Sequence, residues 1–138
     1  MADGADETLS EAFWRVARLL RHRSGESLAR WDIAPSHGRA LGVLARHGPA
    51  RLRELSEHLH IAARSATEVV DALQERGLVQ RRPDPADRRA TLVVLTPKGQ
   101  QVSTAIQDSR AEDAQRLFGA LSASDRAELA RILAKLHD

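Results

Sequence analysis

The fold is decided by residues 52–95, LRELSEHLHIAARSATEVVDALQERGLVQRRPDPADRRATLVVL, because the spacing of apolar residues changes twice within them. Two groups of apolar residues recur three and four positions apart, which places each group on one face of a helix. These groups are Leu52, Leu55 and Leu59, then Ala66, Val69, Val70 and Leu73. Gly77 follows, and a glycine there readily adopts the left-handed conformation that ends a helix. The sequence therefore predicts two short helices joined by a tight turn.

The residues after this glycine have a β-pattern. Residues 78–81 and 91–95 are two short apolar-rich runs, and between them we expect a long polar loop that contains Pro83, Pro85 and Asp87. Helix, tight turn, helix and hairpin form the outline of a winged helix-turn-helix. In such a fold the second helix can enter the DNA major groove while the hairpin, called the wing, reaches along the DNA backbone.

Three motifs in this region resemble those of the MarR family of transcriptional regulators. Residues 69–81 read VVDALQERGLVQR, residues 84–89 read DPADRR and residues 95–99 read LTPKG, in the order and spacing of that family. The resemblance extends from about Ser10 to the C-terminus. It implies a mainly α (α+β) fold in which the N- and C-terminal helices form a dimerisation region. It divides one MarR-type domain, about residues 9–138, into a dimerisation helix (1–33), a winged helix-turn-helix (34–98) and C-terminal dimerisation helices (99–138).

The composition fits one intracellular domain. A chain of 138 residues is long enough for one domain with its own core. The absence of cysteine excludes disulfides and thiol-based sensing. Neither a membrane-length apolar run nor a signal-peptide pattern appears, so we expect a cytoplasmic location and no membrane partner. The whole chain has a formal charge of only +2, whereas residues 76–89 contain five arginines and two aspartates, so positive charge is concentrated on the predicted wing.

Helical patterns flank the winged region on both sides. We expect a first helix from Leu9 with Ser10 as its N-cap, weakened at Ser24 and Gly25, and a second that starts at Pro35 and stops at Gly48. A long helix is predicted from Thr96 and Pro97 to about Phe118, and a last one after a capping box at residues 122–125. The first and last helices carry apolar stripes with nothing local to cover them: Phe13, Val16, Ala17 and Leu20, then Leu129, Ile132, Leu133 and Leu136.

Candidate DNA contacts lie early in the second helix of the helix-turn-helix. Arg64 can donate two hydrogen bonds to guanine, and Ser65 and Thr67 can bond to bases or phosphate. The alternative is that all three are ordinary solvated helix residues. Compared with the resembled family, Ala62 replaces a common Ser cap, which forfeits about 1 kcal/mol, and Glu68 replaces a common basic residue. Glu68 could repel phosphate or accept a hydrogen bond from cytosine N4.

The wing supplies further candidate contacts, Arg81, Arg88 and Arg89. Arg89 matches the second Arg of the family's wing tip, which the resemblance implies is a minor-groove probe, and Arg88 is expected to approach phosphate. We expect Asp87 to bond turn amides and orient an arginine, and Asp71 to pair with Arg81 or Arg89 and so brace the wing. The alternative is a solvated charged loop.

An effector site is less well defined. Trp14 could line the cleft in which relatives bind aromatic acids, with Arg18, His22 or His37 as partners of an anionic group. A Trp in this place is more often part of a dimer core, and we favour that interpretation.

Neither a metal site nor a catalytic site is predicted. His58 and His60 suggest zinc, but zinc needs three or four convergent ligands, which without cysteine must come from several helices, so we interpret them as ordinary histidines. There is no Gly-rich phosphate loop, nucleophile elbow or zinc-protease motif. We therefore predict no cofactor and no enzymatic activity.

The sequence thus predicts a DNA-binding transcriptional regulator. The resemblance to the MarR family implies a ligand-responsive repressor that binds a pseudo-palindromic operator of double-stranded DNA as a homodimer, with a small aromatic or anionic effector. Two alternatives are an effector-independent DNA binder or activator, and a protein-interaction module of the same fold that has lost DNA binding. Ala62 and Glu68 give the second alternative slight support.

Overall fold

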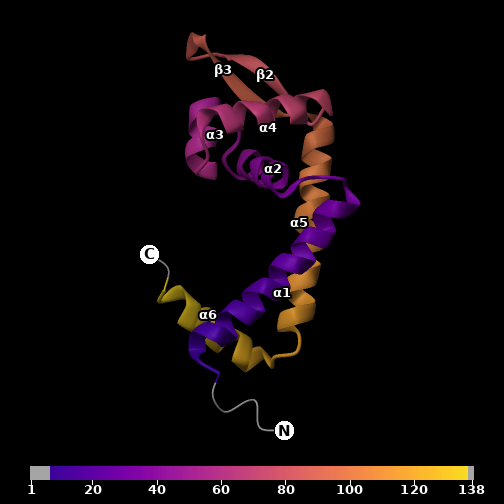
Figure 1. The fold of residues 1–138 in the computed structure, drawn as a ribbon, viewed down its shortest axis with the longest axis vertical. Helices are drawn as coiled ribbons and strands as arrows, with labels where there is room; N and C mark the ends of the chain where they lie inside the picture. The colour runs from indigo at the N-terminus through magenta and orange to yellow at the C-terminus, as the bar shows by residue number, and fades with distance from the viewer. Residues whose placement is uncertain (1–6, 137–138) are drawn as a thin grey trace. The chain divides into compact units, whose positions relative to one another are not determined.

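The computed structural model describes residues 7–136 and is mostly helical, with a small antiparallel sheet (Figure 1). The chain divides into two compact units. One unit is Gly25–Asp108, and we call it the winged unit. The other comprises the chain up to Ser24 and from Ser109 onward, and we call it the terminal unit. The elements in order are α1 (Leu9–Arg30), α2 (Pro35–His47), β1 (Ala50–Arg51), α3 (Leu52–Leu59), α4 (Ala63–Glu75), β2 (Val79–Asp84), β3 (Asp87–Leu95), α5 (Pro97–Phe118) and α6 (Ala123–Ala134).

The winged unit has an apolar core that joins α2, α3, α4 and the sheet. The inward face predicted for α4 is confirmed, because Ala66, Val69, Val70 and Leu73 are all buried. Leu55 and Leu59 of α3 and Leu41 and Leu44 of α2 pack with them. Leu28, Ile33 and Ile106 also belong to this core. The compact unit therefore includes the end of α1 and the first half of α5 in addition to the predicted 34–98 region.

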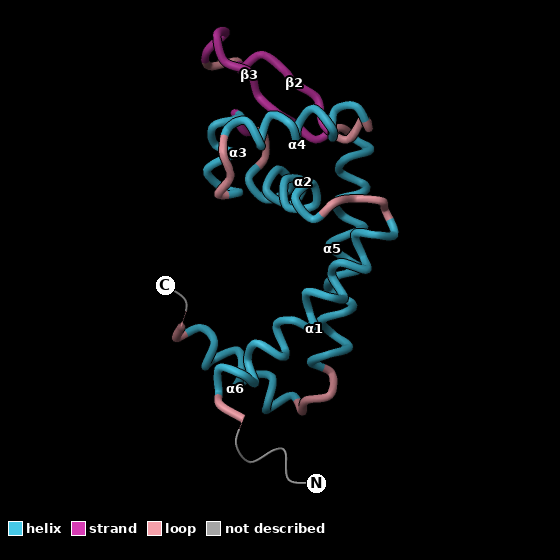
Figure 2. The backbone as a smooth tube through the Cα atoms, viewed as in Figure 1, coloured by secondary structure: helices cyan, strands magenta, loops and turns pink. Residues whose placement is uncertain are grey.

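The hairpin differs from the prediction at its tip. The prediction of a long polar loop is wrong. Strand β2 continues to Asp84 and β3 begins at Asp87, so that Pro85 and Ala86 alone form the turn (Figure 2). The strand order is β1-β3-β2, so β2 lies at an edge of the sheet. An edge strand tolerates Pro83 because the missing N–H can lie on the unpaired side. The register irregularity falls between Pro83 and Asp84. The short strand β1 was not predicted, since two residues carry no periodicity.

The LTPKG motif fastens the start of α5 to the end of α4. The Thr96 hydroxyl donates to the carbonyl oxygen of Gly77 (2.6 Å) and accepts from the amide of Gly99 (3.0 Å). Gly99 then lies so close to the chain that a Cβ there would be 1.9 Å from the carbonyl oxygen of Leu78. The motif thus needs a hydroxyl to cap the helix and a glycine to admit the neighbouring backbone.

The terminal unit contains the first part of α1, the last part of α5, and α6. None of the described residues 7–23 and 109–136 is buried. Ser10 is not the N-cap of α1: the helix begins at Leu9, and Thr8 and Glu11 instead exchange the two hydrogen bonds of a capping box. At α6 half of the predicted capping box is observed, because the Ser122 hydroxyl accepts from the Asp125 amide. The described helices include none that is long and apolar enough to cross a membrane.

Candidate DNA-binding surface

Helix α4 lies at the end of the winged unit that also carries the hairpin (Figure 1). The chain turns sharply into α4 through His60, which has a left-handed backbone (φ 53°). Ala62 is the N-cap and supplies no side-chain hydrogen bond, as its identity predicts. Arg64, Ser65 and Glu68 are exposed. Three of the four predicted contact residues of α4 therefore lie on its outward face.

Thr67 differs from these three residues. It is only half-exposed, and its hydroxyl donates to the carbonyl oxygen of Ala63 one turn earlier (3.1 Å). This bond uses the hydroxyl proton, so towards a nucleic acid Thr67 can offer only an acceptor oxygen or its methyl group.

Arg81 joins the wing to α4. Its guanidinium lies 2.7 Å from a carboxylate oxygen of Asp71 and also donates to the side-chain oxygen of Gln74. Of the two partners expected for Asp71, Arg81 and Arg89, the structure therefore selects Arg81. This geometry fixes β2 against α4, and it leaves Arg81 less free for DNA than an unpaired arginine would be.

The wing tip is held by two residues that the sequence analysis missed. Asp84 is buried (8% exposed), and its two carboxylate oxygens accept from the Ala86 amide (2.9 Å) and from the Arg51 guanidinium (2.7 and 3.1 Å). The hydrogen bond from the Ala86 amide lowers the pKa of the Asp84 carboxyl most, and the hydrogen bond from Arg51 lowers it further. The hydrogen bond between Arg51 and Asp84 in turn raises the pKa of Arg51. One carboxylate thus connects the turn to β1. The signal that could have revealed it is the Asp-Pro-x-Asp turn, in which Asp84 has the position to accept from the turn amide.

Asp87 takes one of its two expected roles. Its carboxylate accepts from the Arg89 amide (3.0 Å), as predicted for a turn residue. Among the described residues it forms no ion pair with an arginine, and the carboxylate that pairs with Arg51 is that of Asp84. Arg88 and Arg89 are exposed and form no hydrogen bond or ion pair with the described residues through their side chains. These two guanidinium groups are therefore available to a ligand.

Arg76 does not contribute to the charge of the wing as the sequence suggested. It ends α4, and its guanidinium donates to the carbonyl oxygens of Asp32 (2.6 Å) and Trp31 (3.0 Å) in the connection between α1 and α2. Its role in this unit is to hold that connection, so the free cations of the hairpin lie closer to the tip.

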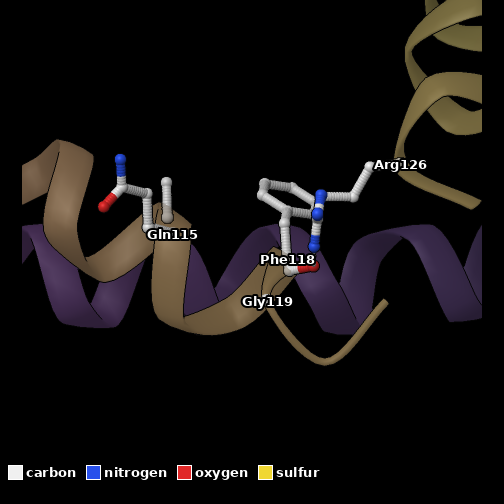
Figure 3. Close-up of a pocket in the computed structure, with 5 residues that line it drawn as sticks. Gln115, Phe118, Gly119 and Arg126 are labelled. Carbon is white, nitrogen blue, oxygen red and sulfur yellow. Dashed lines mark hydrogen bonds between the residues drawn. The ribbon is translucent and has the colours of Figure 1, made fainter. Parts of the chain in front are cut away.

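The four proposed effector residues are not gathered by any described cavity. Trp14 is 55% exposed and contacts Phe13 edge to face, with ring centroids 6.0 Å apart. Arg18 and His22 are exposed on the same helix, whereas half-buried His37 belongs to α2 of the winged unit. Two pockets lie instead between the end of α5 and α6. One, of about 380 Å³, is lined by Ala114, Gln115, Phe118, Gly119 and Arg126 (Figure 3).

Arg126 closes one side of this pocket. Its side chain extends from α6 toward Phe118, as Figure 3 shows, and its guanidinium donates to the carbonyl oxygen of Leu121 (2.7 Å). A second pocket, of about 270 Å³, continues from Phe118 along Leu129 and Leu133 of α6. Both pockets are open and mostly apolar, which suits packing against another apolar surface better than recognition of a charged ligand.

The histidines form no metal site in the described part of the chain, where no group of three or more potential ligands converges. His58 instead stacks on His47, with ring centroids 4.2 Å apart, and connects α2 with α3.

Comparisons with known proteins agree with this architecture. A family model described as MarR family matches residues 31–90. The HTH-type transcriptional regulator YkoM of Bacillus subtilis is 30% identical over 127 residues, which cover 92% of this chain and 82% of that relative. The HTH-type transcriptional repressor NicR of Pseudomonas putida is 32% identical over 98 residues, covering 71% of this chain and 62% of the relative. The structure of a MarR family protein from Bacillus stearothermophilus superposes with a TM-score of 0.86 at 27% identity, covering 94% of this chain and 90% of the other. The chain therefore belongs to the MarR family and is a DNA-binding transcriptional regulator rather than an enzyme.

Proposed function

We propose that the chain acts as a homodimeric repressor that binds a pseudo-palindromic operator and releases it when a small ligand binds. Each half-site would receive one α4 in the major groove and one wing along the backbone. The observation that carries this proposal is the shared exposed surface of the winged unit. There the outward face of α4 and the unpaired Arg88 and Arg89 lie at one end, and Arg81 holds the two elements together.

The homodimer is supported by the composition of the terminal unit. Its large apolar side chains are uncovered within one chain: Leu9, Phe13, Trp14, Val16, Leu19, Ile132, Leu133 and Leu136. A monomeric protein rarely exposes so many large apolar groups in one compact unit. A second copy of the same unit would bury most of them while leaving Trp14 to the effector, and a two-fold dimer would match the two halves of a pseudo-palindrome.

Repression is supported by the name of the relative NicR, a transcriptional repressor. The proposed effector is a small aromatic acid held by the face of α1 that carries Trp14 and Arg18, four residues apart. An aromatic ring and a guanidinium at this spacing offer one partner for the ring and one for the carboxylate of such a ligand. A ligand that binds better to the DNA-free arrangement would release the operator by population shift.

DNA binding is tested by fluorescence anisotropy with the duplex from the intergenic region upstream of the gene, at several salt concentrations. We expect salt-dependent binding that is stronger than binding to random DNA. Arg89→Ala should weaken it and reduce the slope of log K against log salt by about 1 per wing. Arg131→Ala removes the same charge from α6, where Arg131 pairs with Glu128, and should leave the slope unchanged. Binding no stronger than to random DNA would favour the protein-interaction module.

The effector is tested by adding benzoate and related aromatic acids to the same complex. We expect a decrease in anisotropy as DNA is released, and a weaker response for Arg18→Ala, with Arg131→Ala again as the control. An affinity for DNA that no acid changes would favour the effector-independent DNA binder.

A further inference from the structure

Helix α4 and the hairpin carry opposite charge although both belong to the proposed DNA-binding surface. Within α4 the charged side chains are Arg64, Glu68, Asp71 and Glu75, one cation and three carboxylates. The two strands of the hairpin carry Arg81, Arg82, Arg88 and Arg89 against Asp84 and Asp87. Electrostatic attraction to phosphate therefore comes from the hairpin, and α4 gains little from it.

The carboxylates of α4 differ in their surroundings. Asp71 is compensated by Arg81 (2.7 Å), and Glu75 lies in the last turn of the helix. Glu68 lies in the second turn, is exposed, and forms no hydrogen bond or ion pair with the described residues. Arg64, four residues before it, is exposed and unpaired in the same way. The i,i+4 spacing places these two side chains on one face, with Cβ atoms about 6 Å apart.

An uncompensated carboxylate in a DNA groove needs a hydrogen-bond donor. The major groove offers two, N4 of cytosine and N6 of adenine, and adenine also presents the acceptor N7 beside its donor. Cytosine therefore suits a carboxylate better than adenine does. Arg64 has the complementary chemistry, because its guanidinium can donate to both N7 and O6 of guanine.

We propose that Glu68 selects a cytosine in each operator half-site, next to a guanine selected by Arg64, so that α4 supplies base selectivity while the wing supplies salt-dependent affinity. This inference rests on the proposed operator binding. The inference also assigns a function to the carboxylate at position 68, where this chain departs from its family. Glu68 weakens binding to every DNA sequence that lacks the cytosine, because on such a sequence the carboxylate remains unpaired near phosphate.

The inference is tested by enriching a randomised duplex library with the full chain, followed by anisotropy with duplexes that differ at single base pairs. The wild-type chain should enrich guanine and cytosine at neighbouring positions of each half-site. Glu68→Gln should replace the cytosine by adenine, because an amide can donate to N7 and accept from N6. The preference for cytosine over adenine at that position should fall by about 5- to 150-fold. Arg64→Ala should remove the guanine preference alone.

The matched control is Glu75→Gln, which makes the same change of charge at the other end of α4 and should enrich the wild-type sequence. If Glu68→Gln enriches an unchanged sequence while the wild type enriches a defined one, the inference is wrong. It is equally wrong if Glu68→Gln and Glu75→Gln both only tighten binding to random DNA. If the wild type enriches no sequence and shows no salt-dependent binding, operator binding itself fails, and this inference fails with it.

Discussion

The two compact units of this chain use their apolar residues in different ways. In the winged unit, leucine and valine side chains from four helices and a sheet are buried against one another. In the terminal unit, none of the described residues is buried, although α1 and α6 carry clear apolar stripes. The winged unit can therefore be stabilised by its own core, whereas the terminal unit needs a partner surface. Stability and oligomeric state should consequently respond to substitutions in different units.

The largest expected difference is between two leucine truncations. Leu73→Ala leaves a cavity in the core of the winged unit and should lower the free energy of unfolding by about 2–5 kcal/mol. Leu133→Ala removes the same atoms from a side chain that is 38% exposed and should cost the winged unit nothing. Hydrogen exchange of the buried amides of α4, at one fixed protein concentration, measures the stability of the winged unit in both variants. Equal losses would contradict the separation of the two units.

A second contrast compares two glycines inside helices of the winged unit. Gly99→Ala places a methyl group 1.9 Å from the Leu78 carbonyl oxygen, so the backbone must move, and we expect a loss of about 1–3 kcal/mol or more. Gly42→Ala meets no atom within 4 Å and should stabilise α2 by about 0.5–1 kcal/mol. The melting temperatures of the two variants, measured by thermal unfolding, should therefore shift in opposite directions from that of the wild type. A stable Gly99→Ala protein would show that the helix and strand need not approach so closely.

The terminal unit is probed by a charge on its apolar stripe. Ile132→Asp should weaken the proposed dimer by at least about 10- to 100-fold, because the carboxylate would be buried without a partner. Sedimentation equilibrium over a range of protein concentrations measures the change. Ala127→Asp adds the same charge on the opposite face of α6 and is the control. A dimer unaffected by Ile132→Asp would exclude this stripe from the interface.

The smallest effect is expected at the wing tip and depends on pH. Folding lowers the pKa of Asp84, so this carboxylate stabilises the native state at pH values above its ordinary pKa of about 4, and the contribution disappears as the pH falls through the lower folded value. Asp84→Asn should therefore melt at a lower temperature than the wild type at pH 7, and the difference should narrow below about pH 4. Asp87→Asn is the matched control, since Asp87 lacks an arginine partner among the described residues. A difference that stays constant with pH would contradict the role given to Asp84.

Local pattern accounts for what could be predicted. The inward residues of α4, the glycine that ends it and the Thr-Pro start of α5 each follow from residues within a few positions of one another. The prediction failed where the decisive partner is remote. Strand β1 forms only because Ala50 and Arg51 pair with Val93 and Leu92 of β3. The strands of the hairpin continue to the turn because the Asp84 carboxylate accepts a hydrogen bond from Arg51. A two-residue strand and a single ion pair leave no periodic trace in a sequence.

The sequence by itself determined the winged helix-turn-helix, the family and the apolar stripes of the terminal helices, because helix and strand periods, turn glycines and helix caps are local properties. Tertiary structure decided which arginines are free to meet DNA. Arg51, Arg81 and Arg76 engage partners 33, 10 and 45 residues away, and Arg88 and Arg89 remain unpaired at the wing tip. Arginines look alike in a sequence, since their side chains have the same charge and reach. Only the packing that brings a distant carboxylate or carbonyl within hydrogen-bonding distance separates the structural ones from those available to a ligand.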